Sequence, residues 1–364
     1  MSSVRRTATP DSLLRQEVLD MQAYSTPDSV GMIKLDAMEN PYPLPQWLSE
    51  QIASLAAGAA INRYPDADPR SLKDAIRTVI DLPRDLDILL GNGSDEIIQL
   101  LALATAKQNA VLLSVEPSFV MYKMIAAFTG MQYVGVPLAN DFTLDVPALL
   151  AAIEQQQPAL MFLSYPNNPS GNLFDAQAMA RIIEAAPGLV VVDEAYYNFA
   201  DSSFLPMIKH HPNLLVMRTF SKLGMAGLRL GFLVGSKTWL GQLEKLRLPY
   251  NISVLTQLVA EQLLRSHDVL QSQAEQIKRD RVMVYEHLEA IDGVQPYPSA
   301  ANFILFRVRH AGKIFQGLKE RGVLIKDLSR AHPLLSDCLR VTIGTPQENE
   351  CFVQALQESV RQCV

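Results

Sequence analysis

The sequence predicts an α/β protein with a large domain on a mostly parallel sheet and a smaller α+β domain toward the C-terminus. Two observations lead to this prediction. Between residues 86 and 235, short apolar runs alternate with helical stripes, and such alternation gives a parallel sheet that helices cover on both faces. After Tyr250 the pattern changes to long helices followed by a few separate strands, which indicates the second, smaller domain.

Three regions follow from these patterns. Residues 1 to 40 are predicted to form an N-terminal arm, because most of this stretch is polar and irregular. Pro41 and Pro43 exclude helix from the link after it. The large domain is then predicted to span residues 41 to 255, and the small domain residues 256 to 364.

Hydrophobic periodicity assigns the individual elements. Helices of the large domain are predicted at residues 47–57, 71–80, 97–106, 117–129, 146–155 and 175–186. Its strands are predicted at residues 86–90, 110–114, 132–136, 159–164, 189–192 and 214–217, with another beginning at Phe232. The small domain is predicted to contain helices at residues 255–264, 269–291, 311–321 and 348–362, and strands at residues 301–308, 323–325 and 338–343.

Composition narrows the class of protein. The chain has 364 residues, of which 48% are apolar and 19% charged, as is ordinary for a globular enzyme. A net charge of −6 without basic runs gives no electrostatic case for binding nucleic acid or a membrane surface. The cysteines lie near the C-terminus without CxxC spacing, which argues against disulfides or a metal site and suits a cytoplasmic location. No apolar run approaches the ~20 residues of a membrane span, and no signal peptide is expected.

The strand predicted at residues 214–217 leads to the most specific signal. Ser221, Lys222 and Arg229 follow it closely. A lysine just past a buried strand can lose its hydration and act as a nucleophile, and a nearby serine and arginine suit a phosphate. These residues indicate a lysine that forms a Schiff base with pyridoxal 5′-phosphate (PLP). The alternative is a surface lysine in a loop.

A strand–glycine–helix junction gives a second signal. The strand at residues 86–90 runs into Gly91, Gly93, Ser94 and Asp95, just before a strongly apolar helix. Glycines let backbone N–H groups converge, and a helix N-terminus attracts anions, so the junction suits the cofactor phosphate. The alternative is ordinary helix capping, with Ser94 as the N-cap.

Other strand ends carry the remaining groups that PLP needs. Asp193 follows a buried strand, and its carboxylate suits a protonated ring nitrogen. Asn168 and Tyr196 suit the phenolate oxygen as donors, and Phe119 suits stacking over the ring. The alternatives are a cap or turn for Asp193, a turn for Asn168 and core packing for Phe119. Ligands of parallel sheets bind beyond the carboxyl ends of the strands, so we expect these residues to share one cleft.

Together these motifs resemble the fold-type I PLP-dependent aminotransferases, and within them the histidinol-phosphate branch. The resemblance covers about residues 35 to 345. It implies a mostly parallel sheet of the seven-stranded type between helices, with a smaller C-terminal domain, and PLP as cofactor. The motifs are Glu-Asn-Pro-Tyr at 39–42, Arg-Tyr-Pro-Asp at 63–66, Gly-Ser-Asp-Glu at 93–96, Pro-Asn-Asn-Pro-Ser-Gly at 166–171, Asp-Glu-Ala-Tyr at 193–196, Thr-Phe-Ser-Lys at 219–222, Ala-Gly-Leu-Arg-Leu-Gly at 226–231 and Leu-Arg-Val-Thr-Ile-Gly-Thr at 339–345.

The resemblance also implies a homodimer whose active sites lie at the subunit interface. Tyr64 would then reach the cofactor phosphate of the other subunit, and Tyr24 in the arm would close over the other subunit's substrate. Arg340 would bind the substrate anion. Further residues that match positions near the substrate are Asn40, Tyr250, Asn302 and Lys326.

The implied reaction is a ping-pong transamination. The amino group passes from L-glutamate to imidazole acetol phosphate, which gives L-histidinol phosphate and 2-oxoglutarate in histidine biosynthesis. Lys222 would be the general acid and base, Asp193 would hold the ring nitrogen, and Tyr196 would add a donor.

Other activities of the same fold stay open. They are a phosphoamino-acid lyase such as a threonine-phosphate decarboxylase, and an aromatic aminotransferase. A PLP-sensing transcription regulator is disfavoured because no basic helix-turn-helix pattern precedes the fold. The missing GxGxxG pattern disfavours a dinucleotide dehydrogenase.

The chain departs from the family pattern at four points. Met38 stands where a polar residue, often Asn, precedes Glu-Asn-Pro, and Phe119 replaces a tyrosine over the ring. Lys326 stands where an arginine often helps to bind the substrate phosphate. The interval from Lys222 to Arg229 is one residue shorter than in many relatives, so a tighter turn is expected between them.

Overall fold

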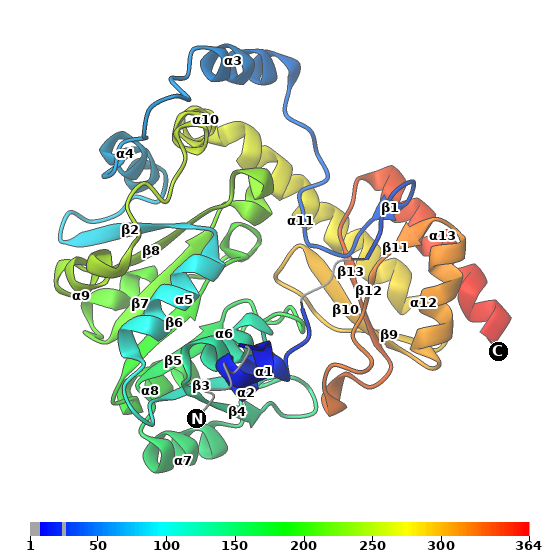
Figure 1. The fold of residues 1–364 in the computed structure, drawn as a ribbon. Coiled ribbons are helices and arrows are strands. Elements are labelled where there is room, and N and C mark those ends of the chain that lie inside the picture. The colour runs from blue at the N-terminus through cyan, green and yellow to red at the C-terminus, as the bar shows by residue number, and fades with distance from the viewer. Residues whose placement is uncertain (1–7, 24–26, 364) are drawn as a thin grey trace, which may run out of the picture.

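A seven-stranded sheet forms the centre of the larger part of the molecule (Figure 1). The computed structural model describes residues 8–23 and 27–363. In spatial order the strands are β2 (Leu86–Asn92), β8 (Leu230–Ser236), β7 (Leu214–Thr219), β6 (Leu189–Asp193), β5 (Leu160–Ser164), β3 (Val111–Glu116) and β4 (Gln132–Pro137). Strands β7 to β4 are paired in parallel, whereas β8 runs antiparallel to both β7 and β2. The mostly parallel sheet predicted from the alternation is therefore confirmed.

Side chains of this sheet alternate between two hydrophobic clusters, one on each face. In β6, Val190 and Val192 join one cluster, while Leu189 and Val191 join the other. Because each apolar face must be shielded from water, helices cover both faces. One face carries α5 (Ser94–Thr105), α6 (Met121–Thr129) and α9 (Lys237–Leu243), and the other carries α7 (Val146–Gln156) and α8 (Ala176–Ala185).

Further helices extend the larger part away from the sheet. Helices α3 (Gln46–Ala57) and α4 (Arg70–Val79) contact α10 (Val254–Arg265), and the long α11 (His267–Glu289) follows it toward the smaller part (Figure 1). Of the helices within residues 8–23 and 27–363, none is long and apolar enough to cross a membrane.

The smaller part is built on a four-stranded antiparallel sheet. Its strands, in spatial order, are β12 (Lys326–Asp327), β13 (Cys338–Thr342), β10 (Phe303–Val308) and β9 (Val294–Pro296). Helices α12 (Ala311–Glu320) and α13 (Pro346–Cys363) pack against each other beside it (Figure 1). The division at residues 40 and 255 into arm, large and small domains stays a prediction.

The N-terminal segment is more ordered than the sequence indicates. Helices α1 (Pro10–Leu13) and α2 (Gln16–Leu19) contain no buried residue, as expected of an arm. Farther along, β1 (Ile33–Lys34) pairs in parallel with β11 (Val323–Leu324), and the carbonyl of Leu35 accepts a hydrogen bond from the Thr342 N–H, 2.8 Å away. The end of the predicted arm is therefore bound to the smaller part.

Two predictions of local structure need correction. Helix α6 begins at Met121 rather than at residue 117, because residues 117–120 form the loop that presents Phe119 to the site. Several short elements, α9 among them, were not predicted because they are too short for a periodic pattern.

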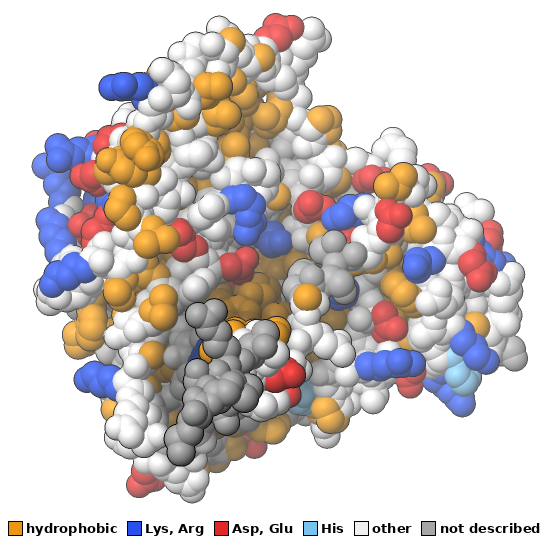
Figure 2. Space-filling model, in the orientation of Figure 1, with side chains coloured by type: hydrophobic (Ala, Val, Ile, Leu, Met, Phe, Trp, Pro, Cys, Tyr) orange, Lys and Arg blue, Asp and Glu red, His pale blue; other side chains and the backbone are white. Residues whose placement is uncertain are grey.

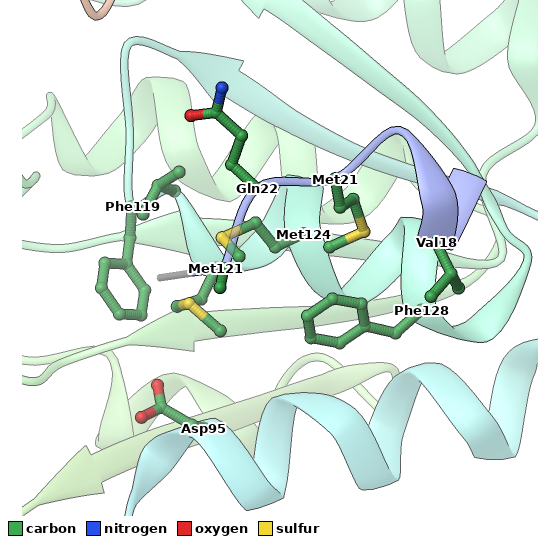
Figure 3. A pocket seen from close by; sticks show the side chains of 10 residues that line it. Val18, Met21, Gln22, Asp95, Phe119, Met121, Met124 and Phe128 are labelled. Atoms are coloured by element: carbon green, nitrogen blue, oxygen red, sulfur yellow. The ribbon is translucent and has the colours of Figure 1, made fainter. Parts of the chain in front are cut away.

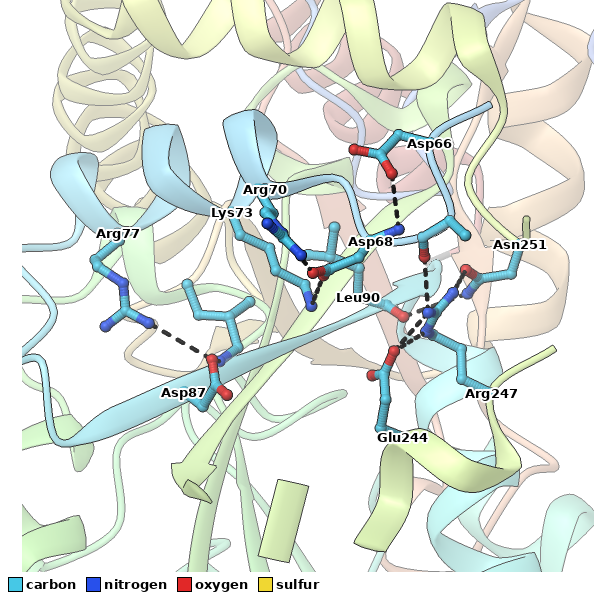
Figure 4. A network of polar contacts seen from close by, with 12 residues as sticks. Asp66, Asp68, Arg70, Lys73, Arg77, Asp87, Leu90, Glu244, Arg247 and Asn251 are labelled. Atoms are coloured by element: carbon cyan, nitrogen blue, oxygen red, sulfur yellow. Dashed lines mark hydrogen bonds and ion pairs between the residues drawn. The ribbon is translucent and has the colours of Figure 1, made fainter. Parts of the chain in front are cut away.

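A polar network joins three segments that are far apart in the sequence (Figure 4). The Arg247 guanidinium donates to the Ala67 carbonyl at 2.8 Å and to Asn251 Oδ1 at 2.9 Å. The Asn251 amide donates in turn to the Glu96 carboxylate, 2.7 Å away at the start of α5. These bonds hold the loops that carry Tyr64 and Tyr250 against the edge of the large sheet.

Replacing Phe306 by alanine tests the core of the smaller sheet. This side chain lies in β10, is fully buried and packs against Phe352. We expect Phe306→Ala to lower the free energy of unfolding by about 3–5 kcal/mol, because the buried ring and its packing are both lost. Urea denaturation followed by circular dichroism measures the change. Phe128→Ala, at a ring that is 38% exposed, is the control and should cost less than about 1 kcal/mol; equal losses would contradict the prediction.

Candidate active site

A cavity of about 100 Å³ lies at the carboxyl ends of β5, β6 and β7. Nine of the predicted cofactor residues line it, namely Ser94, Asp95, Phe119, Asn168, Asp193, Tyr196, Ser221, Lys222 and Arg229. On the face shown in Figure 2 the molecule is hollowed between its larger and smaller parts, with hydrophobic side chains on the floor of the hollow. Residues spread over more than a hundred positions of sequence therefore meet in one place, because parallel strands end at the same edge of the sheet.

Lys222 lies in a short turn directly after β7. Burial, with a smaller contribution from the nearby Arg340 charge, lowers the pKa of its amine to about 8. Its Nζ donates a hydrogen bond to the Ala37 carbonyl, 3.1 Å away. A lysine with this pKa is partly neutral near neutral pH, and a neutral amine is the form that attacks a carbonyl.

The turn between Lys222 and Arg229 is compact, and that it is tighter than the turn of relatives stays a prediction. It consists of two successive 3₁₀ turns separated by Gly224 and Met225. Gly224 has φ +119°, a conformation that other residues rarely adopt, and a Cβ there would lie 3.0 Å from the Asn40 amide. Arg229 itself ends the second turn in the left-handed conformation, with φ 50°.

Asp193 is the last residue of β6 and is almost fully buried. Its Oδ1 accepts the Ala195 N–H at 3.0 Å, and its Oδ2 accepts the Tyr122 hydroxyl at 2.6 Å. Burial raises the pKa of this carboxyl to about 6, and the two hydrogen bonds oppose that rise. Tyr122 was not predicted as a site residue, although it lies one helical turn after Phe119.

Asn168 connects the smaller part of the molecule with the cofactor cavity. Arg340 Nη1 donates to Asn168 Oδ1 at 2.5 Å, and Asn168 Nδ2 donates to the Tyr196 hydroxyl at 3.2 Å. All three side chains are buried. Burial raises the pKa of Tyr196 well above its usual range, so its hydroxyl keeps its proton.

The N-terminus of α5 forms a candidate anion-binding site. Gly93, not Ser94, is the N-cap residue, and within residues 8–23 and 27–363 no side chain caps this helix. The capping alternative for Ser94 is therefore wrong. Gly93 has φ +83°, and a Cβ there would lie 2.7 Å from Arg229 Nη2. Free helix N–H groups beside Arg229 and Ser221, in one cavity, suit a dianionic phosphate.

A second cavity, of about 230 Å³, borders the first. Met38, Phe119 and Asn168 line both cavities. Lys326 and Arg340, both predicted to bind substrate, line the second, as do Lys123 and His332, which the sequence did not single out. Glu116 also lines this cavity and lies 3.7 Å from Lys123, so the candidates for binding an anionic ligand are Lys326 and Arg340.

Two other predicted substrate residues position the backbone of the segment before Pro41. Asn302 donates to the Met38 carbonyl at 2.9 Å. Asn40 donates to the Leu223 carbonyl at 3.1 Å and to Gln273 Oε1 at 2.9 Å. A contact of either side chain with the substrate stays a prediction.

Tyr64, predicted to reach the other subunit, and Tyr250, predicted to lie near the substrate, line neither of these two cavities. Tyr64 and Tyr250 stack on each other, with ring centroids 4.5 Å apart, and the side chain of Tyr64 is 81% exposed. Tyr24 lies outside the described residues. The predicted roles of Tyr64 and Tyr24 in the other subunit's site, and of Tyr250 near the substrate, stay predictions.

A third cavity, of about 620 Å³, separates the arm from α6 (Figure 3). Its walls are mostly apolar side chains of the arm and of α6, such as Met21, Met124 and Phe128. Asp95 and Phe119 line it as well as the cofactor cavity. The cofactor residues are therefore bordered by an apolar space on the arm side.

Comparison with known proteins identifies the family. Residues 30–356 match the family model "Aminotransferase class I and II", and the chain belongs to that family. It is a PLP-dependent aminotransferase.

Among its relatives are histidinol-phosphate aminotransferases. That of Chromobacterium violaceum is 50% identical over 96% of this chain and 98% of its own length. "Histidinol-phosphate aminotransferase 2" of Nitrosococcus oceani is 50% identical over 94% of this chain and 96% of its own.

Solved structures show the same fold. The histidinol-phosphate aminotransferase of Sinorhizobium meliloti, in complex with pyridoxal-5′-phosphate, superimposes with a TM-score of 0.87 at 24% identity, over 97% of this chain and 99% of its own. The L-threonine-O-3-phosphate decarboxylase of Porphyromonas gingivalis superimposes with a TM-score of 0.77 at 22% identity, over 90% of this chain and 99% of its own. The fold alone therefore does not separate transaminases from lyases.

The pH dependence of Lys222 reactivity is a direct test of its environment. We expect its rate of labelling by acetic anhydride, in protein freed of cofactor, to rise with pH through a midpoint near 8, because the pKa of the amine is lowered to about 8. Mass spectrometry of peptides after brief labelling at a series of pH values measures the midpoint. A midpoint near 10.5, the ordinary lysine value, would contradict the prediction.

Proposed function

We propose that this enzyme is a histidinol-phosphate aminotransferase. It transfers the amino group between L-glutamate and imidazole acetol phosphate, and so forms L-histidinol phosphate and 2-oxoglutarate in histidine biosynthesis in the cytoplasm. The observation that carries this proposal is the 50% identity to a histidinol-phosphate aminotransferase over 96% of the chain. The cations of the second cavity are consistent with a phosphorylated substrate.

The residues of the first cavity supply each contact that PLP needs. Lys222 provides the amine and Asp193 the carboxylate for the ring nitrogen; Asn168 and Tyr196 provide donors to the phenolate oxygen. Phe119 would stack over the ring. The phosphate would be held by Ser94, the Asp95 N–H, Ser221 and Arg229. When bound, the cofactor withdraws electrons from the substrate carbon that carries the amino group.

Lys222 is also the proton carrier of the reaction. With the cofactor and substrate bound, its Nζ would take the proton from the substrate carbon that bears the amino group and later return it. A pKa near 8 suits this role, since the amine can both accept and return a proton near neutral pH. Tyr196 and Asn168 would donate hydrogen bonds to the phenolate oxygen of the cofactor.

The substrate anion would bind to Arg340 and Lys326. In a ping-pong reaction the two substrates occupy one site in turn, so the same cations must accept a phosphate from one and a carboxylate from the other. A guanidinium fork binds either group with two hydrogen bonds. Arg340 also donates to Asn168, which links the anion site to the donors around the cofactor.

Comparison of three substrates tests this function. We expect single turnover of the PLP-loaded enzyme, followed by the spectrum of the bound cofactor, to be fastest with histidinol phosphate, slower with phenylalanine and slow with threonine phosphate. Fastest conversion of phenylalanine would indicate an aromatic aminotransferase instead. Release of carbon dioxide from threonine phosphate would indicate a lyase.

The variant Lys326→Met tests the phosphate contact in the same assay, run at a series of substrate concentrations. The histidinol phosphate concentration that gives half of the maximal single-turnover rate should rise about tenfold, because one charged contact to the phosphate is lost, and that for phenylalanine should be nearly unchanged. Lys237→Met, at the start of α9, should affect neither substrate.

The enzyme is proposed to act as a homodimer with shared active sites. Tyr64 stacks on Tyr250 at the surface, and Ile61 and Leu248 beside them in sequence are 74% and 70% exposed. Several large apolar side chains that are exposed close together are typical of a protein–protein interface. Tyr64 does not line the cofactor cavity of its own chain, so it is available to another subunit.

Mixing two inactive variants tests this arrangement. Lys222→Ala and Tyr64→Ala proteins, unfolded together and refolded, should recover about a quarter of the wild-type activity, because half of the dimers are hybrids with one intact site of two. Light scattering after size-exclusion chromatography measures the mass of the assembly. A mixture that shows only the mean activity of the two variants would place Tyr64 and Lys222 in the same subunit's site.

A further inference from the structure

The carboxylate of Asp193 is held from two sides by groups of the chain itself. Its Oδ1 accepts the N–H of Ala195 from the loop after β6, and its Oδ2 accepts the hydroxyl of Tyr122 from α6. The second bond is the shorter, at 2.6 Å against 3.0 Å. Asp193 lines the cofactor cavity, whereas Tyr122 does not. Tyr122 therefore acts on the cofactor cavity from behind, through residues such as Asp193 that line it.

Two aromatic contacts fix the position of the Tyr122 hydroxyl. Its ring stacks on Phe162 of β5, with centroids 4.7 Å apart and planes 7° from parallel. Phe119 meets it edge-on, with centroids 5.6 Å apart. The whole side chain is buried, so the ring cannot turn away from Asp193 without leaving its packing. The hydroxyl is thus held toward Asp193, with the Ser164 side chain as a second polar neighbour.

The surroundings of Asp193 otherwise favour loss of its charge. Burial raises the pKa of this carboxyl to about 6, and the nearby charges of Asp95 and Glu194 push it in the same direction. The groups that oppose this rise are the Tyr122 hydroxyl and the Ala195 N–H. Burial and the charge of Asp193 also raise the pKa of Tyr122 well above its usual value, so the hydroxyl remains a donor at any working pH.

We propose that Tyr122 is a positioning residue for the ring nitrogen of the cofactor. Its hydroxyl occupies one lone pair of Asp193 Oδ2, keeps the carboxylate charged, and turns its remaining lone pairs toward the cavity. The interaction between Asp193 and a protonated ring nitrogen depends on that charge and direction. This inference rests on the role proposed above for Asp193, and it is independent of which amino acid the enzyme converts.

Binding of two cofactor forms tests the proposal without turnover. PLP and 1-deaza-PLP differ only in the ring nitrogen, which is a carbon atom in the second. Wild-type protein should bind PLP more tightly than 1-deaza-PLP, as measured by titration of the cofactor-free protein. In Tyr122→Phe, which keeps the ring and removes the hydroxyl, affinity for PLP should fall about tenfold, as for loss of a hydrogen bond to a charged group. Affinity for 1-deaza-PLP should stay nearly unchanged.

Tyr165→Phe is the matched control. Tyr165 is equally buried, but its hydroxyl bonds to the neutral Ser202 at 3.0 Å, so the preference for PLP should be that of the wild type. An unchanged preference in Tyr122→Phe, or equal losses for both cofactor forms in a natively folded variant, would overturn the proposal. A wild-type protein that binds PLP and 1-deaza-PLP with equal affinity would also overturn the proposal, because Asp193 would then not interact with the ring nitrogen.

A second measurement serves if Tyr122→Phe does not fold. Tyr122 replaced by 3-fluorotyrosine keeps the ring and makes the hydroxyl a stronger donor. Because Asp193 must be charged to hold the ring nitrogen, PLP affinity should decline as pH falls through the pKa of Asp193, which is about 6. The fluorinated residue should move that midpoint to lower pH. A midpoint that stays where it is in the wild type would contradict a role for the hydroxyl.

Discussion

The register between β5, β6 and β7 is the constraint on which the rest of the structure depends. Ser164 is paired with Asp193, and Asp193 with Met217, so three neighbouring strands end at nearly the same level. The amine of Lys222 and the amide of Asn168 lie in the turns that follow β7 and β5, and the carboxylate of Asp193 lies at the end of β6. A slip of one residue in any strand would turn its side chains to the opposite face of the sheet. The geometry of the chemistry is therefore set by backbone pairing.

The segment before Pro41 connects this edge to the smaller sheet. Three successive carbonyls, of residues 36 to 38, accept hydrogen bonds from Arg340, Lys222 and Asn302 in that order. Two of these donors come from the smaller part and the third follows β7 of the larger part. The polar contacts of the candidate site are thus also contacts between the two parts of the molecule, which explains why Arg340 of the smaller part lies so close to Asn168 and Lys222.

Sequence reasoning found those residues that follow a buried strand. Lys222 and Asp193 can be found in this way because each follows an apolar run that predicts a strand. To place a residue after a strand, it is not necessary to know which strand is its neighbour in the sheet. Tyr122 could not be found so, because it lies in a helix and its partner is 71 residues away. The start of α5 was ambiguous for a related reason: the sequence permits Ser94 to cap the helix, and only the backbone of Gly93 decides otherwise.

Met38, which departs from the family pattern, has a strained backbone conformation. Its φ of 54° lies in the left-handed region, where asparagine and glycine are tolerated and methionine costs on the order of 1–3 kcal/mol. The same side chain lines both the cofactor cavity and the substrate cavity. Glycine or asparagine at this position would relax the backbone and remove the apolar side chain that both spaces share. At position 38 the backbone is therefore strained to keep an apolar side chain between the two cavities.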